Sequence, residues 1–254
     1  MRRIRLILEY DGTNYAGWQR QQNAMSVQQR LEEALRKLTE EGALTVTGAS
    51  RTDAGVHALG QNAHFDTECR IPADKFSFAL NTLLPEDIRV VSSGEVTKNF
   101  HARFSAKGKE YRYLFYPHPH AAALYRNLCA HVIYPLDVDL MRREAETMLG
   151  THDFAPFAAS GSVVKDTVRT IDDIRVFENP PFAELRVHGN GFLYNMVRIL
   201  AGTLMLVGSK KLEPGAIARA LESGSRLELG VTAPPQGLTL LRVDYPEEVC
   251  LPPM

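Results

Sequence analysis

The order of predicted strands and helices indicates an α+β fold built from two ferredoxin-like halves with largely antiparallel sheets. In the first part of the chain, strand-like and helix-like segments follow one another as β-α-β-β-α-β, which is the ferredoxin-like order. From Cys129 onward the order is again β-α-β-β-α, followed by an added helix and a closing strand. At roughly 150 residues per domain, the length of 254 residues fits one large domain or two modest ones. We expect domains at 1–104 and 105–254, with a central cleft where the two half-sheets join.

The first half begins with a strand over residues 3–10, because Ile4, Leu6 and Leu8 share one face of an alternating pattern. Ser26 stands at the N-cap position of an amphipathic helix that reaches about residue 41, where Gly42 ends it. The remaining elements of this half are expected over residues 44–49 (strand), 61–67 (strand), 74–84 (helix) and 88–96 (strand).

The second half is expected to hold strands over residues 109–116, 129–134, 167–177, 182–188 and 238–245, and helices over 137–149, 192–207 and 214–222. Residues 150–166 show no periodic pattern and are expected to be irregular. Because one fold serves many functions, the activity depends on the residues of a site and not on the fold alone.

Composition places the chain among globular proteins with a real core. Hydrophobic residues make up 44% and charged residues 23%, and no apolar run approaches the roughly 20 residues that would span a bilayer. The three cysteines are odd in number and far apart, so they suggest neither a disulfide framework nor a zinc site. The N-terminus lacks the apolar segment of a signal peptide, and a reducing cytoplasm is the simplest location.

The stretch from Gly48 to Ala58 concentrates reactive groups in a loop between two predicted strands. It carries Arg51 and Asp53 next to small residues that leave room for a ligand. Catalytic groups are often placed on such loops, which a rigid sheet supports. The alternative is an ordinary Asp-Ala-Gly turn in which Arg51 and Asp53 form a weak surface ion pair.

The stretch from Lys98 to Arg112 is basic although the whole chain has a net charge of −1. It holds five cations and a single anion, Glu110. Phe100, Phe104 and Tyr111 are interleaved with the cations, and Tyr113 follows Arg112 directly. Cations neutralise phosphates and rings stack on bases, so this pattern favours nucleic acid as a partner. The alternative is a solvated strand edge protected by lysines.

A second group of candidate residues runs from His188 to Arg198. Gly191 is expected at the entrance of the following helix, where backbone N–H groups can face an anion. Arg198 lies in an otherwise apolar stretch, and a buried arginine must be paired. Asp53 is a candidate partner; alternatively, Arg198 extends to the surface and pairs with another carboxylate.

Five ordered segments carry a resemblance that covers nearly the whole chain. They are residues 10–19 (YDGTNYAGWQ), 50–58 (SRTDAGVHA), 100–106 (FHARFSA), 109–113 (KEYRY) and 191–198 (GFLYNMVR). In these segments the chain resembles the tRNA pseudouridine synthase A family. The loop opens Ala49-Ser50-Arg51 where family members often have Gly-Arg, which is a small departure.

The resemblance implies isomerisation of uridine to pseudouridine at positions 38 to 40 of the tRNA anticodon stem-loop, by a homodimer that uses no metal and no organic cofactor. It assigns the catalytic aspartate to Asp53 and the ring packed against the target base to Tyr111. It makes Arg198 the ion-pair partner of the aspartate, and Arg51 the loop arginine that helps displace the base.

The chemistry suits these residue types. The reaction breaks a C–N glycosidic bond, turns the base and forms a C–C bond, so no atoms enter or leave and no redox cofactor is required. Unperturbed aspartate titrates near 3.9, so Asp53 is expected to be ionised at neutral pH, and a neighbouring arginine would favour that state. Attack on the sugar, attack on the base and abstraction of a sugar proton all remain open.

Two other functions fit parts of the sequence. A non-catalytic RNA-binding module would explain the ferredoxin-like order but not Asp53 beside Arg51 in one loop. A two-carboxylate glycoside hydrolase would need a second acid near Asp53, for which Glu110 is the nearest candidate in the matched segments.

Overall fold

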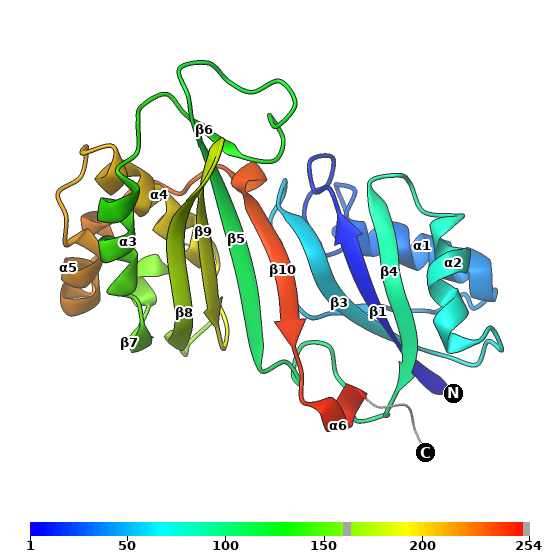
Figure 1. Ribbon diagram of the computed structural model, residues 1–254. Coiled ribbons are helices and arrows are strands. Elements are labelled where there is room, and N and C mark those ends of the chain that lie inside the picture. The colour runs from blue at the N-terminus through cyan, green and yellow to red at the C-terminus, as the bar shows by residue number, and fades with distance from the viewer. Residues whose placement is uncertain (160–163, 251–254) are drawn as a thin grey trace. The chain divides into compact units, whose positions relative to one another are not determined.

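The computed structural model describes residues 1–159 and 164–250 (Figure 1). The chain forms two compact units, Met1–Lys109 with Leu240–Met254, and Glu110–Thr239. The C-terminal strand therefore belongs mainly to the first unit, whereas its position in the sequence predicts the second half. The expected α+β class is confirmed, and most strand pairs are antiparallel.

The first unit is built on three long antiparallel strands in the order β4-β1-β3, with β10 next to β3. They are β1 (Arg2–Tyr10), β3 (His57–Thr67), β4 (Ile88–Val96) and β10 (Leu238–Asp244). Helix α1 (Val27–Thr39) lies behind these strands in the view of Figure 1, and α2 (Phe76–Asn81) packs against β4 after a 3-10 turn at Ala73–Lys75. A short helix α6 (Glu247–Cys250) follows β10.

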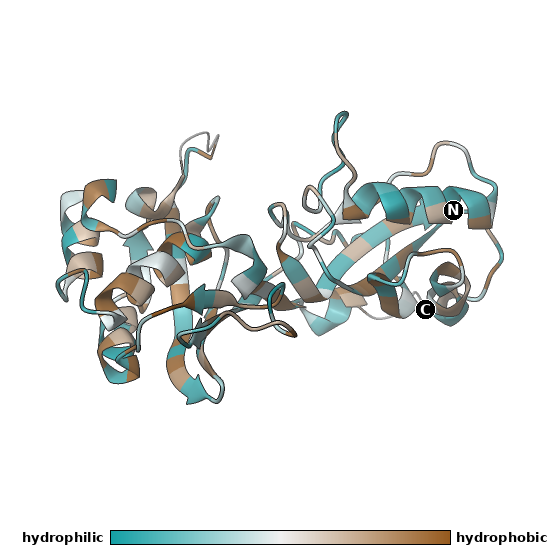
Figure 2. Ribbon diagram, turned by 90° about the horizontal axis from the view of Figure 1, so that it is seen from above, coloured by the Kyte–Doolittle hydropathy of each residue, from teal (hydrophilic) through white to brown (hydrophobic). Residues whose placement is uncertain are grey.

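The core of this unit forms where the sequence pattern places it. Ile4, Leu6 and Leu8 are fully buried on one face of β1, and α1 contributes Leu31 and Leu35. Helix α1 is mostly teal in Figure 2, because only this inward stripe is apolar. The predicted cap is also present, since the Ser26 side chain accepts a hydrogen bond from the backbone N–H of Gln29 at 3.2 Å.

The strand expected over residues 44–49 is much shorter in the structure, where β2 is only Thr47–Gly48. Side chains of α1 take the backbone groups that a longer strand would pair. Glu32 accepts a hydrogen bond from the Val46 N–H at 3.2 Å, and Gln28 donates to the Val46 carbonyl at 3.0 Å. Leu44 and Val46 are buried as the apolar pattern suggests, but against the helix rather than within a ladder.

The second unit has the strand order β5-β9-β8-β7. Its strands are β5 (Gly108–Pro117), β6 (Ala130–Val132), β7 (Gly150–Asp153), β8 (Val168–Asn179) and β9 (Phe182–Gly189). Its helices are α3 (Val138–Glu146), α4 (Met196–Gly208) and α5 (Ala216–Ser223), with 3-10 turns at Ala155–Phe157, Arg226–Glu228 and Pro235–Gly237. Helix α3 packs on β8 and on α4.

Two predictions for this unit need correction. The strand expected over residues 129–134 is shortened to the three residues of β6, which pairs in parallel with the end of β5. The neighbour of β9 in the sheet is β5, in which Tyr113 and Phe115 are buried. Part of the segment expected to be irregular, 150–166, forms β7, whose mostly exposed residues show no apolar alternation; residues 160–163 lie outside the described part.

Candidate active site

The loop that carries Arg51 and Asp53 joins β2 to β3, as predicted. A buried glutamine binds the backbone at the start of this loop. Gln61 on β3 is fully buried. Its side-chain oxygen accepts from the Ser50 N–H at 3.2 Å, and its side-chain nitrogen donates to the Ser50 carbonyl at 2.7 Å. The Ala49 N–H donates to the Asn62 carbonyl at 2.7 Å. Both backbone groups of Ser50 are thus satisfied, so the loop starts from a fixed point.

Lys109 adds a charged contact at the same entrance. Its Nζ donates a hydrogen bond to the Ala49 carbonyl at 3.0 Å and lies 3.5 Å from the Ser50 hydroxyl. A hydrogen bond from an ammonium group is stronger than one between neutral groups. Lys109 therefore helps to hold the backbone that leads to Arg51.

The middle of the loop is held at Thr52, the residue before Asp53. The hydroxyl groups of Tyr10 and Thr52 are 2.8 Å apart, and the backbone N–H of Trp18 donates to the Thr52 carbonyl at 3.0 Å. Both partners belong to the matched segment 10–19, which in the structure forms one wall of the loop. Two segments of the resemblance are therefore in direct contact.

Glycines allow this close approach. Gly17 has φ = 86°, and a Cβ atom built on it would lie 2.3 Å from the Thr52 carbonyl oxygen. A Cβ on Gly12 would lie 2.0 Å from the Val56 carbonyl oxygen. Only glycine fits at such separations, and only glycine adopts the conformation of Gly17 without strain.

A tight turn closes the loop after Asp53. The Val56 N–H donates to the Asp53 carbonyl at 3.1 Å, and Gly55 takes φ = 77° inside the turn. The Gly55 N–H donates to the Tyr15 carbonyl at 3.3 Å. Asp53, which is half-buried, is therefore flanked by anchored backbone on both sides, whereas Arg51 is exposed and accessible to a large substrate.

Tyr111 and Arg198 belong to the second unit. Tyr111 is 6% exposed, and its ring meets Phe192 edge to face with the centroids 5.2 Å apart. Arg198 is half-buried in the first turn of α4, where its Nε donates to the Ala233 carbonyl at 2.9 Å and its Nη1 to the Asn195 side chain at 2.8 Å. These bonds fix the orientation of the guanidinium group.

The expected anion site at Gly191 is not at a helix entrance. Helix α4 begins at Met196, and its N-cap is Asn195, in the left-handed conformation with φ = 61°. Residues 191–195 form the turn that precedes the helix. The prediction was wrong because the apolar residues Phe192 and Leu193 extend the helical pattern without taking part in the helix.

The structure thus divides the four predicted site residues, with Arg51 and Asp53 in one unit and Tyr111 and Arg198 in the other. Three side chains that anchor the loop were not predicted, namely Gln61, Lys109 and Tyr10. Tyr10 and Lys109 lie within the matched segments, which was the available signal. Gln61 gave none, because a glutamine in a predicted strand normally indicates a solvent-facing position.

Neither a metal-binding cluster nor a membrane-spanning helix occurs in the part of the chain that the structure describes. Residues 1–159 and 164–250 contain no group of three or more His, Cys, Asp or Glu side chains placed to hold a metal ion. Within the same residues, none of the helices has both the length and the apolar character needed to cross a membrane.

Comparison with known proteins decides the family. The model of the family described as tRNA pseudouridine synthase matches residues 6–105 and 145–246, which include Asp53 and Arg198. The chain belongs to the tRNA pseudouridine synthase family. As a pseudouridine synthase, it is an isomerase.

Relatives in this family cover nearly the full chain. The tRNA pseudouridine synthase A of Ruminiclostridium cellulolyticum is 52% identical over 246 residues, which is 96% of this chain and 100% of that protein. The tRNA pseudouridine synthase A of Acetivibrio thermocellus is 51% identical over 245 residues, with the same shares. Among solved structures, the archaeal box H/ACA sRNP Nop10-Cbf5 complex is similar at 12% identity with a TM-score of 0.38, covering 80% of this chain and 43% of that one.

Proposed function

We propose that this pseudouridine synthase converts uridine to pseudouridine at positions 38 to 40 of the tRNA anticodon stem-loop, with Asp53 as the catalytic carboxylate. The observation that supports this most is the loop around Asp53. It lies in a segment matched by the family model, and its backbone is anchored at Ser50, at Thr52 and at Gly55. Such anchoring is what a catalytic group needs in order to meet a substrate in one orientation.

In this proposal each predicted residue has one role. The Asp53 carboxylate reacts with the target nucleotide, and Arg198 acts as its charge partner. A uridine inside a stem must be flipped out of the stack, at a cost of a few kcal/mol. Arg51, which is exposed, stabilises the vacated position, and the ring of Tyr111 packs against the flipped base.

The decisive experiment measures release of tritium from C5 of uridine in an anticodon stem-loop transcript. Pseudouridine formation releases this tritium to water, because C5 becomes the glycosidic carbon. We expect release with the native protein and none with Asp53→Asn, while the tRNA affinity of the variant stays within a few-fold. Asp53→Asn differs only in charge and one donor group, so a large loss of binding would contradict the catalytic role.

If the native protein released no tritium but bound the transcript tightly, the non-catalytic RNA-binding module would be the better description. Release of free uracil from the RNA would instead support the glycoside hydrolase alternative. That alternative needs Glu110 as its second acid. In the structure, Glu110 belongs to the second unit and pairs there with Arg175, whose Nη2 is 3.9 Å from Oε1 of Glu110.

The target positions are tested with three transcripts, each with a single labelled uridine at position 38, 39 or 40. We expect release from all three and none from a transcript labelled only elsewhere in the stem-loop. Restriction to a position outside this set would refute the assignment of 38 to 40 and leave the isomerase activity intact.

Tyr111→Ala tests the role of the ring. Loss of a base-stacking side chain is expected to lower kcat more than it weakens tRNA binding, because the flipped base is the one part of the RNA that the ring is proposed to contact. Tyr111→Phe keeps the ring and is the matched control. Equal losses in turnover and affinity would mean that Tyr111 serves general docking.

We also propose that the protein acts as a cytoplasmic homodimer, and that each half of the chain, 1–104 and 105–254, is ferredoxin-like. The β4-β1-β3 order of the first unit supports the last point, and the three free cysteines suit a reducing compartment. Sedimentation at micromolar concentration should give twice the mass of the 28.3 kDa chain. A monomer that retains full activity would contradict the dimer.

A further inference from the structure

Phe104 is an exposed aromatic ring that the proposed function has not used. It lies in the first unit, in the turn formed by residues 101–105, and 77% of its surface is exposed. Phe100 in the same segment is fully buried. Exposed apolar surface contributes nothing to folding, so burial in the core does not explain why a large ring is held here.

The turn below Phe104 is rigid. Nδ1 of His101 accepts hydrogen bonds from the backbone N–H groups of Arg103 and Phe104, each at 3.2 Å. Ser105 closes the turn twice, since its N–H donates to the His101 carbonyl at 2.9 Å and its hydroxyl accepts from the His101 N–H at 3.0 Å. The position of the ring is therefore set before any partner arrives, which reduces the entropy lost on binding.

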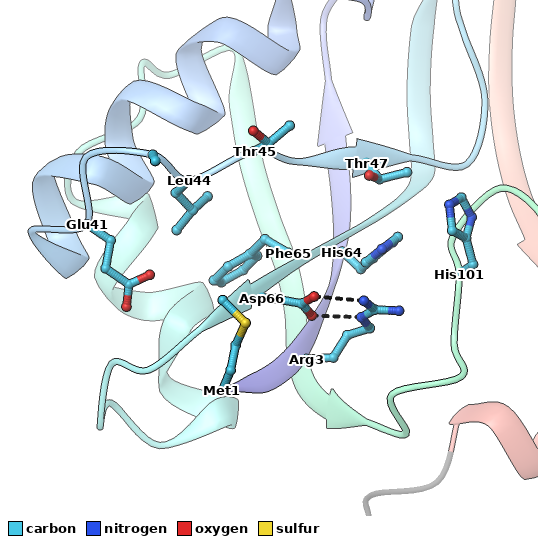
Figure 3. A pocket seen from close by; sticks show the side chains of 11 residues that line it. Met1, Arg3, Glu41, Leu44, Thr45, Thr47, His64, Phe65, Asp66 and His101 are labelled. Carbon is cyan, nitrogen blue, oxygen red and sulfur yellow. Dashed lines mark hydrogen bonds and ion pairs between the residues drawn. The ribbon is translucent and has the colours of Figure 1, made fainter.

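Two further contacts attach this turn to the body of the unit. The Ala102 N–H donates to Nδ1 of His64 on β3 at 3.1 Å, and the Tyr245 hydroxyl donates to the Ala102 carbonyl at 2.6 Å. Figure 3 shows His64 and His101 side by side at one end of a cavity of about 500 Å³, next to the ion pair of Arg3 and Asp66.

The ring of Phe104 is supported from within by that of His101. Their centroids are 4.3 Å apart and their planes are tilted by 31°. The guanidinium carbon of Arg103 lies 5.7 Å from the centroid of Phe104. An aromatic pair with an adjacent cation is the usual form of a platform for a nucleobase.

The charges around the platform suit a polyanion. Lys98, Arg103 and Lys107 are exposed or half-buried, and none of the three makes an ion pair within residues 1–159 and 164–250. Two nearby carboxylates already have cationic partners. Asp66 accepts two hydrogen bonds from Arg3 at 2.7 Å, and Asp244, whose carbonyl accepts from the Lys107 N–H, has its carboxylate 3.2 Å from Nε of Arg242. The platform is thus bordered by cations that are available to phosphates.

The platform and the loop of Asp53 are supported by the same strand. His64, which anchors the turn, pairs across the sheet with Thr47 of β2, and β2 leads directly into the loop. The six residue steps from Thr47 to Asp53 span at most about 20 Å of chain. One RNA molecule can therefore reach both features, because successive nucleotides in a strand are only a few ångströms apart.

We propose that Phe104, backed by His101, is a stacking platform for an unpaired nucleobase of the RNA substrate other than the target uridine, and that Lys98, Arg103 and Lys107 contact the flanking phosphates. The identity of the RNA rests on the proposed function. The existence of the platform does not, because it concerns binding and not turnover.

The test compares substitutions of two similarly exposed phenylalanines. Phe104→Leu keeps the apolar character but removes the aromatic face, and we expect anticodon stem-loop RNA to bind about 5- to 100-fold more weakly. Phe104→Trp keeps the face and should bind within about 3-fold of the native protein. The control is Phe78→Leu, since Phe78 is 68% exposed in the same unit and has Lys75 Nζ 5.3 Å from its ring centroid.

Abasic substitution of single loop nucleotides then locates the base. At one position, or at two adjacent ones, the abasic substitution should weaken binding to the native protein. The same substitution should not weaken binding to Phe104→Leu any further, which is the result expected when the base and the ring are in direct contact. The proposal is overturned if Phe104→Leu binds the RNA as tightly as the native protein does, or if Phe78→Leu loses as much affinity as Phe104→Leu. It is also overturned if every abasic position weakens binding to Phe104→Leu by the same factor as it weakens binding to the native protein. In the last case Phe104 contacts a surface other than a base, such as a protein partner.

The two proposals fail separately. Absence of tritium release from the native protein refutes the isomerisation at this stem-loop, whereas the affinities of the Phe104 variants are measured without turnover. Normal binding by Phe104→Leu, with turnover that still depends on Asp53, refutes the platform alone.

Discussion

At the level of single residues, the position of Asp53 depends on side chains from other segments of the chain. Its carboxylate is carried by a loop that is held at three points by side chains and backbone groups of other segments. Catalysis is sensitive to small displacements, and about 1 Å can cost two orders of magnitude in rate. The residues that set the loop position should therefore affect turnover although they are not expected to react.

Lys109→Met is the sharpest test of this role for the loop anchors. It removes the ammonium that donates to the Ala49 carbonyl, so kcat should fall by about 10- to 100-fold with little change in Tm or in tRNA affinity. Lys109→Arg retains a charged donor and should recover most of the rate. A fall in Tm that accounts for the lost activity, with no recovery by arginine, would show that Lys109 only stabilises the fold.

Gly17→Ala tests the close packing beside the loop. A methyl group would lie 2.3 Å from the Thr52 carbonyl oxygen on a residue with φ = 86°, so the free energy of unfolding should drop by about 1–3 kcal/mol or more. Gly42→Ala is the matched control, because nothing lies within 4 Å of a Cβ atom there. Urea denaturation of both variants gives the comparison, and equal stabilities would show that the loop yields at Thr52.

At the scale of elements, α4 both anchors the second unit and presents a charged group. Arg198→Ala removes the donor to the Ala233 carbonyl and to the Asn195 side chain, so it should lower stability by about 1–3 kcal/mol as well as activity. Arg143→Ala, at an exposed arginine of α3, should change neither. Thermal unfolding and tritium release measure the two effects. An unchanged Tm for Arg198→Ala would mean that these hydrogen bonds are readily replaced by water.

Strand β3 carries a titratable group that links the stability of the first unit to pH. Burial, together with the nearby Arg3 and His101, lowers the pKa of His64 to about 4, below its ordinary value of 6.5. Between these two values the unfolded chain binds more protons at this residue than the folded chain. The contribution of His64 to the free energy of unfolding therefore falls as the pH is lowered from 6.5 toward 4.

Protonation of His64 would also remove the acceptor for the Ala102 N–H, and with it one attachment of the Phe104 turn. His64→Gln keeps a side-chain acceptor but cannot titrate in this range. We expect the decrease in Tm between about pH 7 and pH 5 to be smaller in His64→Gln than in the native protein. If the decrease is the same in both proteins, other groups control the acid stability.

At the scale of the whole molecule, the placement of charge matters more than its total. The chain has a net charge of −1, yet Lys98, Arg103 and Lys107 form a basic group on one unit. Replacing all three by glutamine should weaken RNA binding. It should also make the slope of log K against log salt concentration shallower, by about 0.7–0.9 for each phosphate that is no longer neutralised. An unchanged slope would show that these cations do not bind phosphate. Lys37→Gln on α1 is the control for loss of a single exposed cation elsewhere on the same unit, and it should be compared with Lys98→Gln alone.

Features that depend on local chemistry can be predicted from the order of the residues alone. The Ser26 cap, the β1 alternation and the loop between β2 and β3 follow from the preferences of a few adjacent residues. The five segments of the resemblance pointed to the family that the comparison then showed.

Tertiary structure alone decided which long-range partners these segments have. The strand expected over 44–49 shrinks to β2 because Gln28 and Glu32 of α1 bind its backbone, and no local pattern records that competition. Phe100 and Phe104 look equivalent in the sequence, yet one is buried and the other exposed. Likewise Gln61 holds the loop between β2 and β3 only because folding buried it opposite Ser50, where a polar side chain must find partners.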